Sequence, residues 1–200
     1  MEKINMKGSS FMKKKVSVIF LLVSVLPSAF CQTASDYFPA KEGYRWEYLG
    51  NNGKVTDVYS CTAIERLSDK ESLVGIFINS FGVTTKMIYR VIQDTGVFEI
   101  GTVDNLHYDN PFVSLALQEL KWSEEDRGDK FLCQSKKTSV SFDGKTYNDC
   151  IVVEKAIYIN NNQPLMIKRQ YFARGIGLVY VTLQDEDGIE KPHLRLSSYK

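Results

Sequence analysis

The side chains that most often carry catalysis are scarce in this sequence. It contains two histidines, His107 and His193, which stand far apart in the chain. No Gly-x-Ser-x-Gly elbow, His-Glu-x-x-His helix, Cys-x-x-Cys pair or glycine-rich phosphate loop occurs. Nucleophile, zinc and nucleotide sites therefore lack their usual spacing. We expect no catalytic residue, no metal site and no cofactor, and we predict that the protein is not an enzyme.

Two acidic runs are the remaining candidates for binding a cation. Residues 185–190 (Asp-Glu-Asp-Gly-Ile-Glu) look like the start of a calcium loop, but they lack its twelve-residue ligand spacing. A solvated hairpin turn is the better interpretation of this run. We interpret residues 124–126 (Glu-Glu-Asp) as a charged loop.

Three cysteines, Cys61, Cys133 and Cys150, follow the N-terminal segment, so at least one thiol has no intramolecular partner. Cys133 and Cys150 flank a predicted turn at 143–144, but a regular hairpin does not place them opposite each other. Their Cα atoms then lie beyond the ~7 Å limit for a disulfide unless a bulge shifts the register. We interpret all three as small buried hydrophobic residues, and their disulfide state stays open.

The first 31 residues have the three parts of a secretory signal peptide. Lys13–Lys15 precede an apolar run from Val16 to Leu26, and small residues follow up to Cys31. That run forms a helix of about 16 Å, too short for a bilayer core of ~30 Å. We predict that residues 1–31 are a cleaved signal peptide. Residues 32–200 are then an exported chain, soluble in the periplasm or secreted.

Lipid anchoring through Cys31 is the alternative to a soluble exported chain. Lipoprotein processing requires a small residue before the cysteine, and Phe30 is large. A cut after Cys31 instead leaves Ala29 and Cys31 at the two positions that must be small. The start of translation stays open among Met1, Met6 and Met12.

The composition of the chain excludes several classes of protein. Hydrophobic residues make up 44% and aromatic residues 12%, as in a globular protein. After the first 31 residues, 20 basic and 23 acidic residues remain, so nucleic-acid binding by a broad basic surface has no support. No later run reaches 18 apolar residues, so we expect no transmembrane segment in the exported chain.

Turn signals recur at short intervals between segments rich in Val, Ile, Thr, Tyr and Phe. They stand at residues 50–53, 68–71, 82, 95–96, 143–144, 160–162 and 187–188. This pattern predicts one all-β domain over residues 32–200, mainly an antiparallel meander of about nine strands. So many strands must curl into a barrel, a half-barrel or a sandwich. At most one short helix is expected, near 110–121, where Pro111 suits a first helical turn; an extended crossover is the equal alternative for this stretch.

Strands joined by hairpins must turn their apolar side chains to one common face. Pairing about the first four turns places Tyr48 opposite Val55, Cys61 opposite Ile78, Ile76 opposite Met87, and Tyr89 opposite Thr102. The predicted apolar face is Tyr44, Trp46, Tyr48, Val55, Tyr59, Cys61, Val74, Ile76, Ile78, Met87, Tyr89, Val91, Phe98 and Ile100. Asp57 interrupts this face, and we place it at the rim of the sheet rather than interpret it as a buried functional acid.

The second half of the chain shows a different pattern. Residues 151–153 (Ile-Val-Val) are apolar on both faces, which favours a strand covered on both sides. On the next strand Arg169 falls roughly across from Glu154, which predicts a cross-strand ion pair. Residues 175–177 (Gly-Ile-Gly) predict a bulge or a sharp bend between two strands.

Three short motifs carry a resemblance to a known group of proteins. Residues 37–48 (YFPAKEGYRWEY) resemble the opening FPLKxGNxWxY segment of uncharacterised secreted proteins and lipoproteins, many from Bacteroidetes-type bacteria. Residues 147–153 and 171–179 are similar to the later YxDVIxV and YFAPGIGLV motifs of that group. The sequence departs at Tyr44, where Asn is frequent, and at Arg174, where Pro is common. The resemblance implies an all-β extracytoplasmic domain similar to the curved half-barrel of lipoprotein carriers, and it implies no chemistry.

These observations favour a non-catalytic secreted or periplasmic protein that binds an envelope protein or a small ligand, with the binding residues unknown. One alternative is a carrier that holds an apolar or lipid ligand in a half-barrel cavity, walled by the predicted apolar face. A hydrolase is the least favoured alternative, because no nucleophile and base can be paired.

Overall fold

In the computed structural model the chain divides into two units, residues 1–30 and residues 31–200. The backbone is described for residues 33–102, 105–114, 120–126, 129–158 and 164–200, all in the second unit. Side chains are described for residues 33–102, 135–158 and 164–200. Cys31, the predicted signal peptide, and the side chains of His107 and Cys133 lie outside these ranges.

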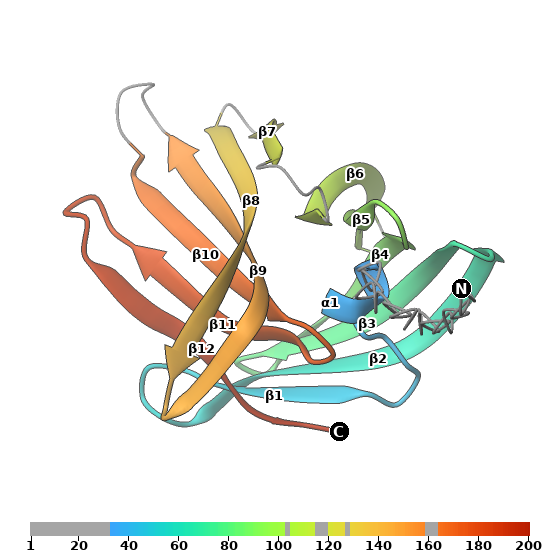
Figure 1. The fold of residues 1–200 in the computed structure, drawn as a ribbon, viewed down its shortest axis with the longest axis horizontal. Helices are drawn as coiled ribbons and strands as arrows, with labels where there is room; N and C mark the ends of the chain where they lie inside the picture. Colours follow the sequence, from blue (N-terminus) through green and yellow to red (C-terminus); the bar gives the residue numbers. More distant parts are fainter. Residues whose placement is uncertain (1–32, 103–104, 115–119, 127–128, 159–163) are drawn as a thin grey trace, which may run out of the picture. The chain divides into compact units, whose positions relative to one another are not determined.

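The described part of the second unit contains one short helix, α1 (Ala34–Tyr37), and twelve strands (Figure 1). The first six strands are β1 (Arg45–Leu49), β2 (Val55–Ser68), β3 (Glu71–Ser80), β4 (Val83–Ile92), β5 (Gly96–Thr102) and β6 (Asn105–Ser114). The other six are β7 (Leu120–Asp126), β8 (Asp129–Phe142), β9 (Lys145–Tyr158), β10 (Met166–Ala173), β11 (Gly177–Gln184) and β12 (Glu190–Tyr199). The predicted all-β fold is confirmed.

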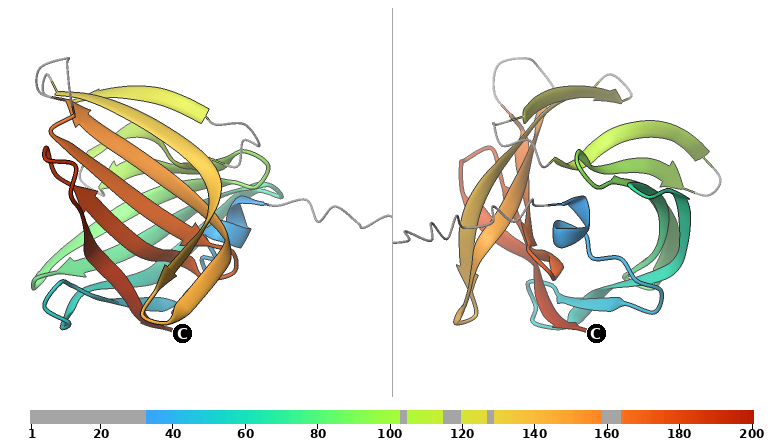
Figure 2. Two further views of the ribbon diagram at one scale, coloured as in Figure 1. Left: turned by 60° about the vertical axis from the view of Figure 1, so that its left-hand side comes forward. Right: turned by 45° about the vertical axis from the view of Figure 1, so that its right-hand side comes forward.

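All twelve strands form one antiparallel sheet in the order β6-β5-β4-β3-β2-β1-β12-β11-β10-β9-β8-β7. Every neighbouring pair is consecutive in the chain except β1 and β12, where Trp46 pairs with Tyr199. The two edge strands, β6 and β7, are consecutive in sequence, and the sheet is not closed between them. A twisted sheet of twelve strands curls, so its two halves face each other across an interior (Figure 2).

Within the range 110–121, the described residues 110–114 and 120–121 are strand and not helix, and residues 115–119 lie outside the described part of the chain. Residues up to Ser114 belong to β6 and those from Leu120 to β7, while α1 lies near the start of the described chain. Pro111 pairs with Phe98 on an edge strand, the place in a sheet that tolerates a missing backbone N–H. Residues 124–126, predicted to be a loop, are likewise the end of β7. Short apolar runs are ambiguous between helix and strand, which explains why the sequence leaves both open for this stretch and why the predicted number of strands is too low.

The predicted registers hold to different degrees. Ile76 pairs with Met87, as predicted. In the first two hairpins the pairing is displaced by two residues, so Tyr48 pairs with Asp57 and Cys61 with Ile76. An even displacement leaves each side chain on its predicted face. Val55 is nevertheless 50% exposed, contrary to its predicted place on the apolar face.

The fourth hairpin is wrong by an odd number of residues. A bulge leaves Ile100 without a partner, so Tyr89 pairs with Glu99 rather than with Thr102. Because an odd displacement reverses the two faces of a strand, Val97 packs in the core, whereas Phe98 and Ile100 do not belong to the core cluster. We call the face that carries Tyr48, Ile76 and Tyr89 the interior face.

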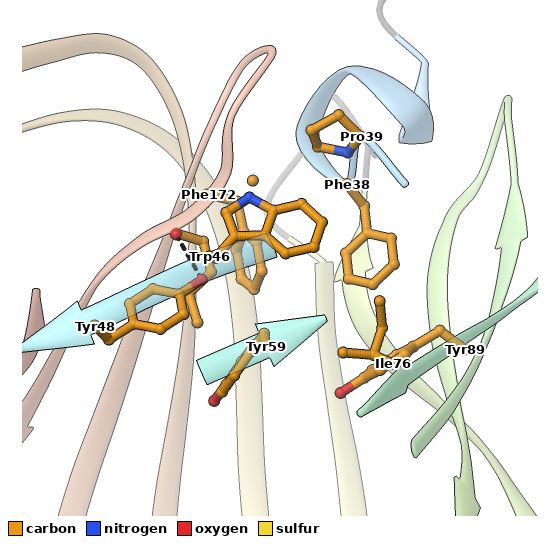
Figure 3. A pocket seen from close by; sticks show the side chains of 10 residues that line it. Phe38, Pro39, Trp46, Tyr48, Tyr59, Ile76, Tyr89 and Phe172 are labelled. Atoms are coloured by element: carbon orange, nitrogen blue, oxygen red, sulfur yellow. Dashed lines mark hydrogen bonds between the residues drawn. The ribbon is translucent and has the colours of Figure 1, made fainter. Parts of the chain in front are cut away.

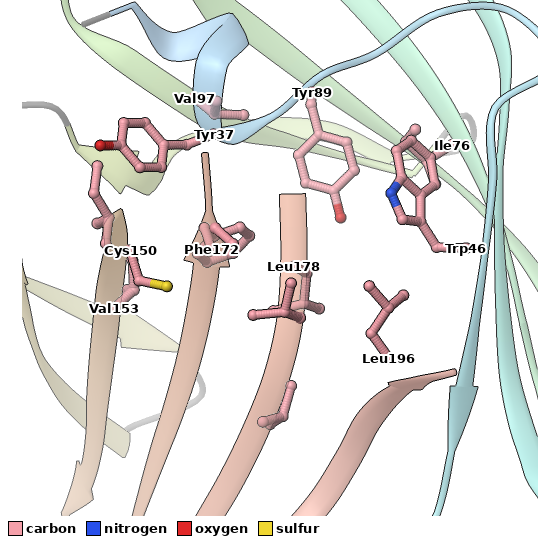
Figure 4. Close-up of a cluster of buried hydrophobic side chains, with 14 of the residues drawn as sticks. Tyr37, Trp46, Ile76, Tyr89, Val97, Cys150, Val153, Phe172, Leu178 and Leu196 are labelled. Atoms are coloured by element: carbon pink, nitrogen blue, oxygen red, sulfur yellow. The ribbon is translucent and has the colours of Figure 1, made fainter. Parts of the chain in front are cut away.

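The core joins the two halves of the sheet through α1 (Figure 4). Ala34 and Tyr37 on α1 are fully buried, and the helix contacts β4, β6 and β11. In Figure 2 the helix lies inside the curl, near the turns that follow β4 and β10. We call this end of the sheet the α1 end. The opposite end, with the turns β1–β2, β3–β4 and β11–β12, is the far end.

The second half of the sheet confirms several predictions. Ile151, Val152 and Val153 are all buried, as expected for a strand covered on both sides. Arg169 pairs with Glu154, and their Nε and Oε2 atoms are 2.7 Å apart. Residues 174–176 form the turn between β10 and β11.

Two of the cysteines are described, and both are free thiols. Cys61 and Cys150 are buried, as predicted for small hydrophobic residues. Burial raises the pKa of each thiol from 9.0 to about 11. In the backbone register Cys150 faces Thr138, and Cys133 faces Lys155.

Candidate functional site

A small apolar pocket lies inside the curled sheet, next to the segment that follows α1 (Figure 3). It is lined by Phe38, Pro39, Trp46, Tyr48, Tyr59, Ile76, Tyr89, Phe172, Gly177 and Leu178. Its volume, counted as the space open to the centre of a water molecule, is about 30 Å³. That is room for roughly two water molecules. A typical site for a drug-sized ligand has roughly 300–1,000 Å³.

The polar atoms of the pocket wall nearest to β11 are already hydrogen-bonded. The indole Nε1 of Trp46 donates to the carbonyl oxygen of Ile176 over 2.8 Å. The Tyr48 hydroxyl donates to the carbonyl oxygen of Leu178 over 3.0 Å. These bonds fix the two rings and consume their donors, so this wall presents mainly carbon to a ligand.

Three tyrosine rings form a layer along the interior face at the pocket. Tyr48 and Tyr59 are in ring contact at 4.9 Å between centroids, and Tyr89 contacts Phe38 at 5.1 Å. Burial is the main cause that raises the pKa of all three phenols above 10.0. They stay neutral at physiological pH and act as large amphipathic wall residues.

Polar contacts of α1 hold in place the segment that follows the helix, which closes one side of the pocket. The Tyr37 hydroxyl donates to Asp149 Oδ1 over 2.7 Å, and burial raises its pKa. Arg174 Nη2 lies 3.2 Å from Asp36 Oδ2. The amide of Ala34 donates to the carbonyl oxygen of Gln93 over 2.8 Å. The helix is therefore held to both halves of the sheet.

Ionisable side chains follow the tyrosine layer toward the far end. Asp57 pairs with Tyr48 and Glu99 with Tyr89, so both carboxylates lie on the interior face. On β10, Lys168 is four residues before Phe172, on the same face and about 13 Å along the strand. Lys155 lies directly opposite Lys168.

Electrostatic interactions connect these groups across the interior. Burial lowers the pKa of Lys168, the carboxylate of Glu99 raises it, and Lys155 lowers it further. Burial also lowers the pKa of His193, as does the ammonium of Lys168, while Asp57 opposes the shift. The interior therefore changes from apolar at the α1 end to ionisable toward the far end. A ligand with one apolar and one polar part matches this gradient.

The structure brings together some predicted residues and separates others. Asp57 is only 6% exposed and accepts a hydrogen bond from Thr56 Oγ1 at 2.8 Å, so its predicted place at the rim is wrong. His193 has no partner in the β11–β12 register, where a bulge falls between Pro192 and Leu194. It is half-buried and belongs to the ionisable group of the interior.

The other polar candidates lie away from the interior group. Arg169 on β10 contacts Glu154, Gln184 and Glu190, which links four strands, β9 to β12, on the opposite face. The run 185–190 begins with the predicted turn, where Asp185 accepts from the amide of Ile189. Among the described side chains, no group of three His, Cys, Asp or Glu residues is placed to hold a metal ion.

Two interior residues, Glu99 and Lys168, were missed by sequence reasoning. Glu99 was assigned to the outer face because the β4–β5 bulge was not foreseen. For Lys168 a signal existed. Alternation from Phe172 through Gln170 places it on the buried face, but a lysine in a strand usually indicates a solvated face.

Comparisons with known proteins extend to solved structures alone. No protein-family model matches the chain, and no curated protein does. A "putative lipoprotein" from Parabacteroides distasonis is similar over 85% of this chain and 99% of its own, with 16% identity and a TM-score of 0.47. A "putative exported protein with YmcC-like fold" from Bacteroides fragilis is similar over 80% and 97%, with 11% identity and a TM-score of 0.44. Likenesses this distant assign no activity to the chain.

Proposed function

We propose that the chain is an exported, non-catalytic binding protein whose site is the interior of the curled sheet. Residues 1–31 are its cleaved signal peptide, and residues 32–200 are the single binding domain in the periplasm or outside the cell. Within the described residues, no helix is long and apolar enough to cross a membrane. The bound molecule is small and amphipathic.

One observation carries this proposal: a carbon-lined pocket opens beside interior ionisable groups, without a catalytic set. Trp46 and Tyr48 give their polar atoms to the backbone, so the pocket selects an apolar group. Lys168 offers a cation on the same face toward the far end. The described side chains include no hydrogen bond between a histidine and a carboxylate, serine or cysteine, as a general base would require.

A carrier of a long apolar or lipid ligand is the second candidate. The volume of about 30 Å³ is far too small for an acyl chain. One side of the pocket, however, is formed by Phe38 and Pro39, which belong to no strand. Outward movement of this segment would enlarge the pocket without separating any pair of strands. That feature favours the carrier over a site enclosed by sheet alone.

Fluorescence of Trp46 tests the pocket directly. We would use the exported chain with Trp122→Phe, which leaves Trp46 as the single tryptophan, and titrate it with 12-bromododecanoate. Bromine quenches an indole only at close range, so saturable quenching is expected if the Phe38–Pro39 segment moves outward and the apolar end enters the enlarged pocket. Native mass spectrometry of protein from its own periplasm would show whether a natural ligand is already bound.

Two substitutions on one strand make the test specific. Ile76 lines the pocket, whereas Ile78 lies on the same face of β3 outside it. Ile76→Phe should fill the pocket and lower the affinity measured by the quenching titration about tenfold. Ile78→Phe should leave this affinity unchanged. Phe38→Ala should strengthen binding, most of all if the protein is a carrier. Equal affinities for all these variants would refute the pocket as the binding site.

A further inference from the structure

Two tight turns of the sheet share one backbone conformation and differ in sequence. At the β8–β9 turn Asp143 and Gly144 have φ values of 47° and 73°. At the β3–β4 turn Phe81 and Gly82 have φ values of 49° and 85°. Aspartate and asparagine tolerate this left-handed region, whereas a bulky aromatic residue is strained in it. Phe81 is therefore a poor choice for the turn itself.

Packing does not compensate for this strain. Phe81 is 77% exposed, the most exposed large hydrophobic residue in the described part of the chain. Val83 is 68% exposed and Val55 is 50% exposed. The amide of Phe81 donates to the carbonyl oxygen of Thr56 over 3.1 Å, which ties the β3–β4 turn to the start of β2. We call Val55, Phe81 and Val83, which lie at the far end, the apolar tip.

The two segments that carry the apolar tip contain charges of one sign. Segments 50–56 and 79–86 contain Lys54 and Lys86, and neither segment contains an acidic residue. Asp57, the next residue of β2, is buried rather than presented to solvent. The β11–β12 turn at the same end contains Asp185, Glu186 and Asp187. An anionic surface is therefore attracted at the tip and repelled at this turn.

We propose that the apolar tip inserts into an anionic lipid surface, which holds the exported chain at a membrane independently of any acyl group on Cys31. Exposed aromatic and aliphatic side chains flanked by lysine are the residues that partition into the interfacial region of a bilayer. The strain at Phe81 then has a purpose, because it presents the ring at the outermost point of the hairpin. The contact with the lipid surface is local and weak, because only the two neighbouring turns of the apolar tip insert and not a whole amphipathic helix.

Flotation with lipid vesicles tests this proposal. The exported chain, residues 32–200, lacks Cys31 and so excludes acylation there; it would be mixed with vesicles of phosphatidylglycerol or phosphatidylcholine. We expect the chain to float with phosphatidylglycerol vesicles. Added salt should weaken this binding, because Lys54 is exposed and salt screens its attraction to the anionic lipid. Phe81→Asn should weaken binding about tenfold, the loss expected when one buried aromatic ring is removed.

A matched control comes from the other end of the sheet. Leu67 is 48% exposed beside the β2–β3 turn, so Leu67→Asn removes a comparable hydrophobic residue and should leave flotation unchanged. Phe81→Asn should unfold at the same or a higher denaturant concentration than the parent, and it should keep the Trp46 quenching by 12-bromododecanoate. If Phe81→Asn stays folded but binds 12-bromododecanoate more weakly than the parent, that result would count against the proposed function of the pocket and not against the lipid proposal.

Three results would overturn the lipid proposal. The first is no flotation of the parent chain with phosphatidylglycerol. The second is equal flotation of the parent and Phe81→Asn. The third is a dimer in sedimentation analysis without lipid that Phe81→Asn dissociates, because it would assign the apolar tip to contact between two copies of the chain.

Discussion

Two tight turns of the curled sheet reach the same backbone geometry with different residues. At the β8–β9 turn, the aspartate suits the left-handed conformation and pairs with Arg195 at 2.9 Å. At the α1 end, Tyr37 is fully buried and hydrogen-bonded to Asp149. At the far end, Phe81 is strained and exposed, and the interior contains half-buried charges such as Lys168. We infer that stability is concentrated at the α1 end, where the apolar pocket lies, whereas the ionisable groups and the apolar tip lie toward the far end.

The largest effect should come from removing the ring that anchors α1. Tyr37→Ala should lower the free energy of unfolding by about 3–5 kcal/mol, the usual cost of truncating a buried aromatic residue. Urea denaturation followed by circular dichroism measures it. Tyr37→Phe, which loses only the hydrogen bond to Asp149, should cost about 1 kcal/mol. A loss below about 1 kcal/mol for Tyr37→Ala would show that the α1 end is not the stable end.

The thiols provide a second measure of that stability. The pKa of about 11 for Cys61 and Cys150, against 9.0 for an ordinary thiol, lowers the thiolate fraction at pH 8 roughly a hundredfold. In a Cys133→Ser chain, both should react with Ellman's reagent at least that much more slowly in the native state than in denaturant. Rapid native labelling of either thiol would indicate that its region opens readily.

Lys168 should reveal the cost of the polar interior. Its folded-state pKa lies below the usual value, chiefly because of burial, so the fold disfavours its charged form. Lys168→Met should therefore raise the free energy of unfolding at neutral pH, as measured by urea denaturation. If Lys168 recognises the polar part of the ligand, the same variant should weaken 12-bromododecanoate binding. Loss of stability in this variant would contradict the assignment of the charge to the interior.

His193 should give a smaller, pH-dependent effect of the same kind. Its folded-state pKa is lowered from 6.5, mainly by burial and then by Lys168. Between the folded-state and unfolded-state pKa values, the unfolded chain binds more protons, so stability falls as the pH falls through this window. Thermal unfolding at pH 7.5 and pH 5 should show a smaller acid-induced loss for His193→Gln than for the parent chain. An equal loss would place His193 in solvent.

Alternation and turn chemistry alone determined the meander and much of its apolar face. Trp46, Tyr59, Ile76, Met87 and Tyr89 share one face because period-two alternation survives a displacement of register by two residues. The Glu154–Arg169 ion pair was predictable for the same local reason, since the strands on either side are regular in register.

Only the tertiary structure decided what fills the interior. The β4–β5 bulge reverses the face of Glu99, and a bulge has no reliable sequence signal beyond the nearby Gly101. The pairing of β1 with β12 joins the two ends of the chain, so no local pattern reports it. The helix of four residues is too short to form alone. It exists because the two halves of the sheet bury Ala34 and Tyr37 between them, which makes the wall of the pocket a product of the fold.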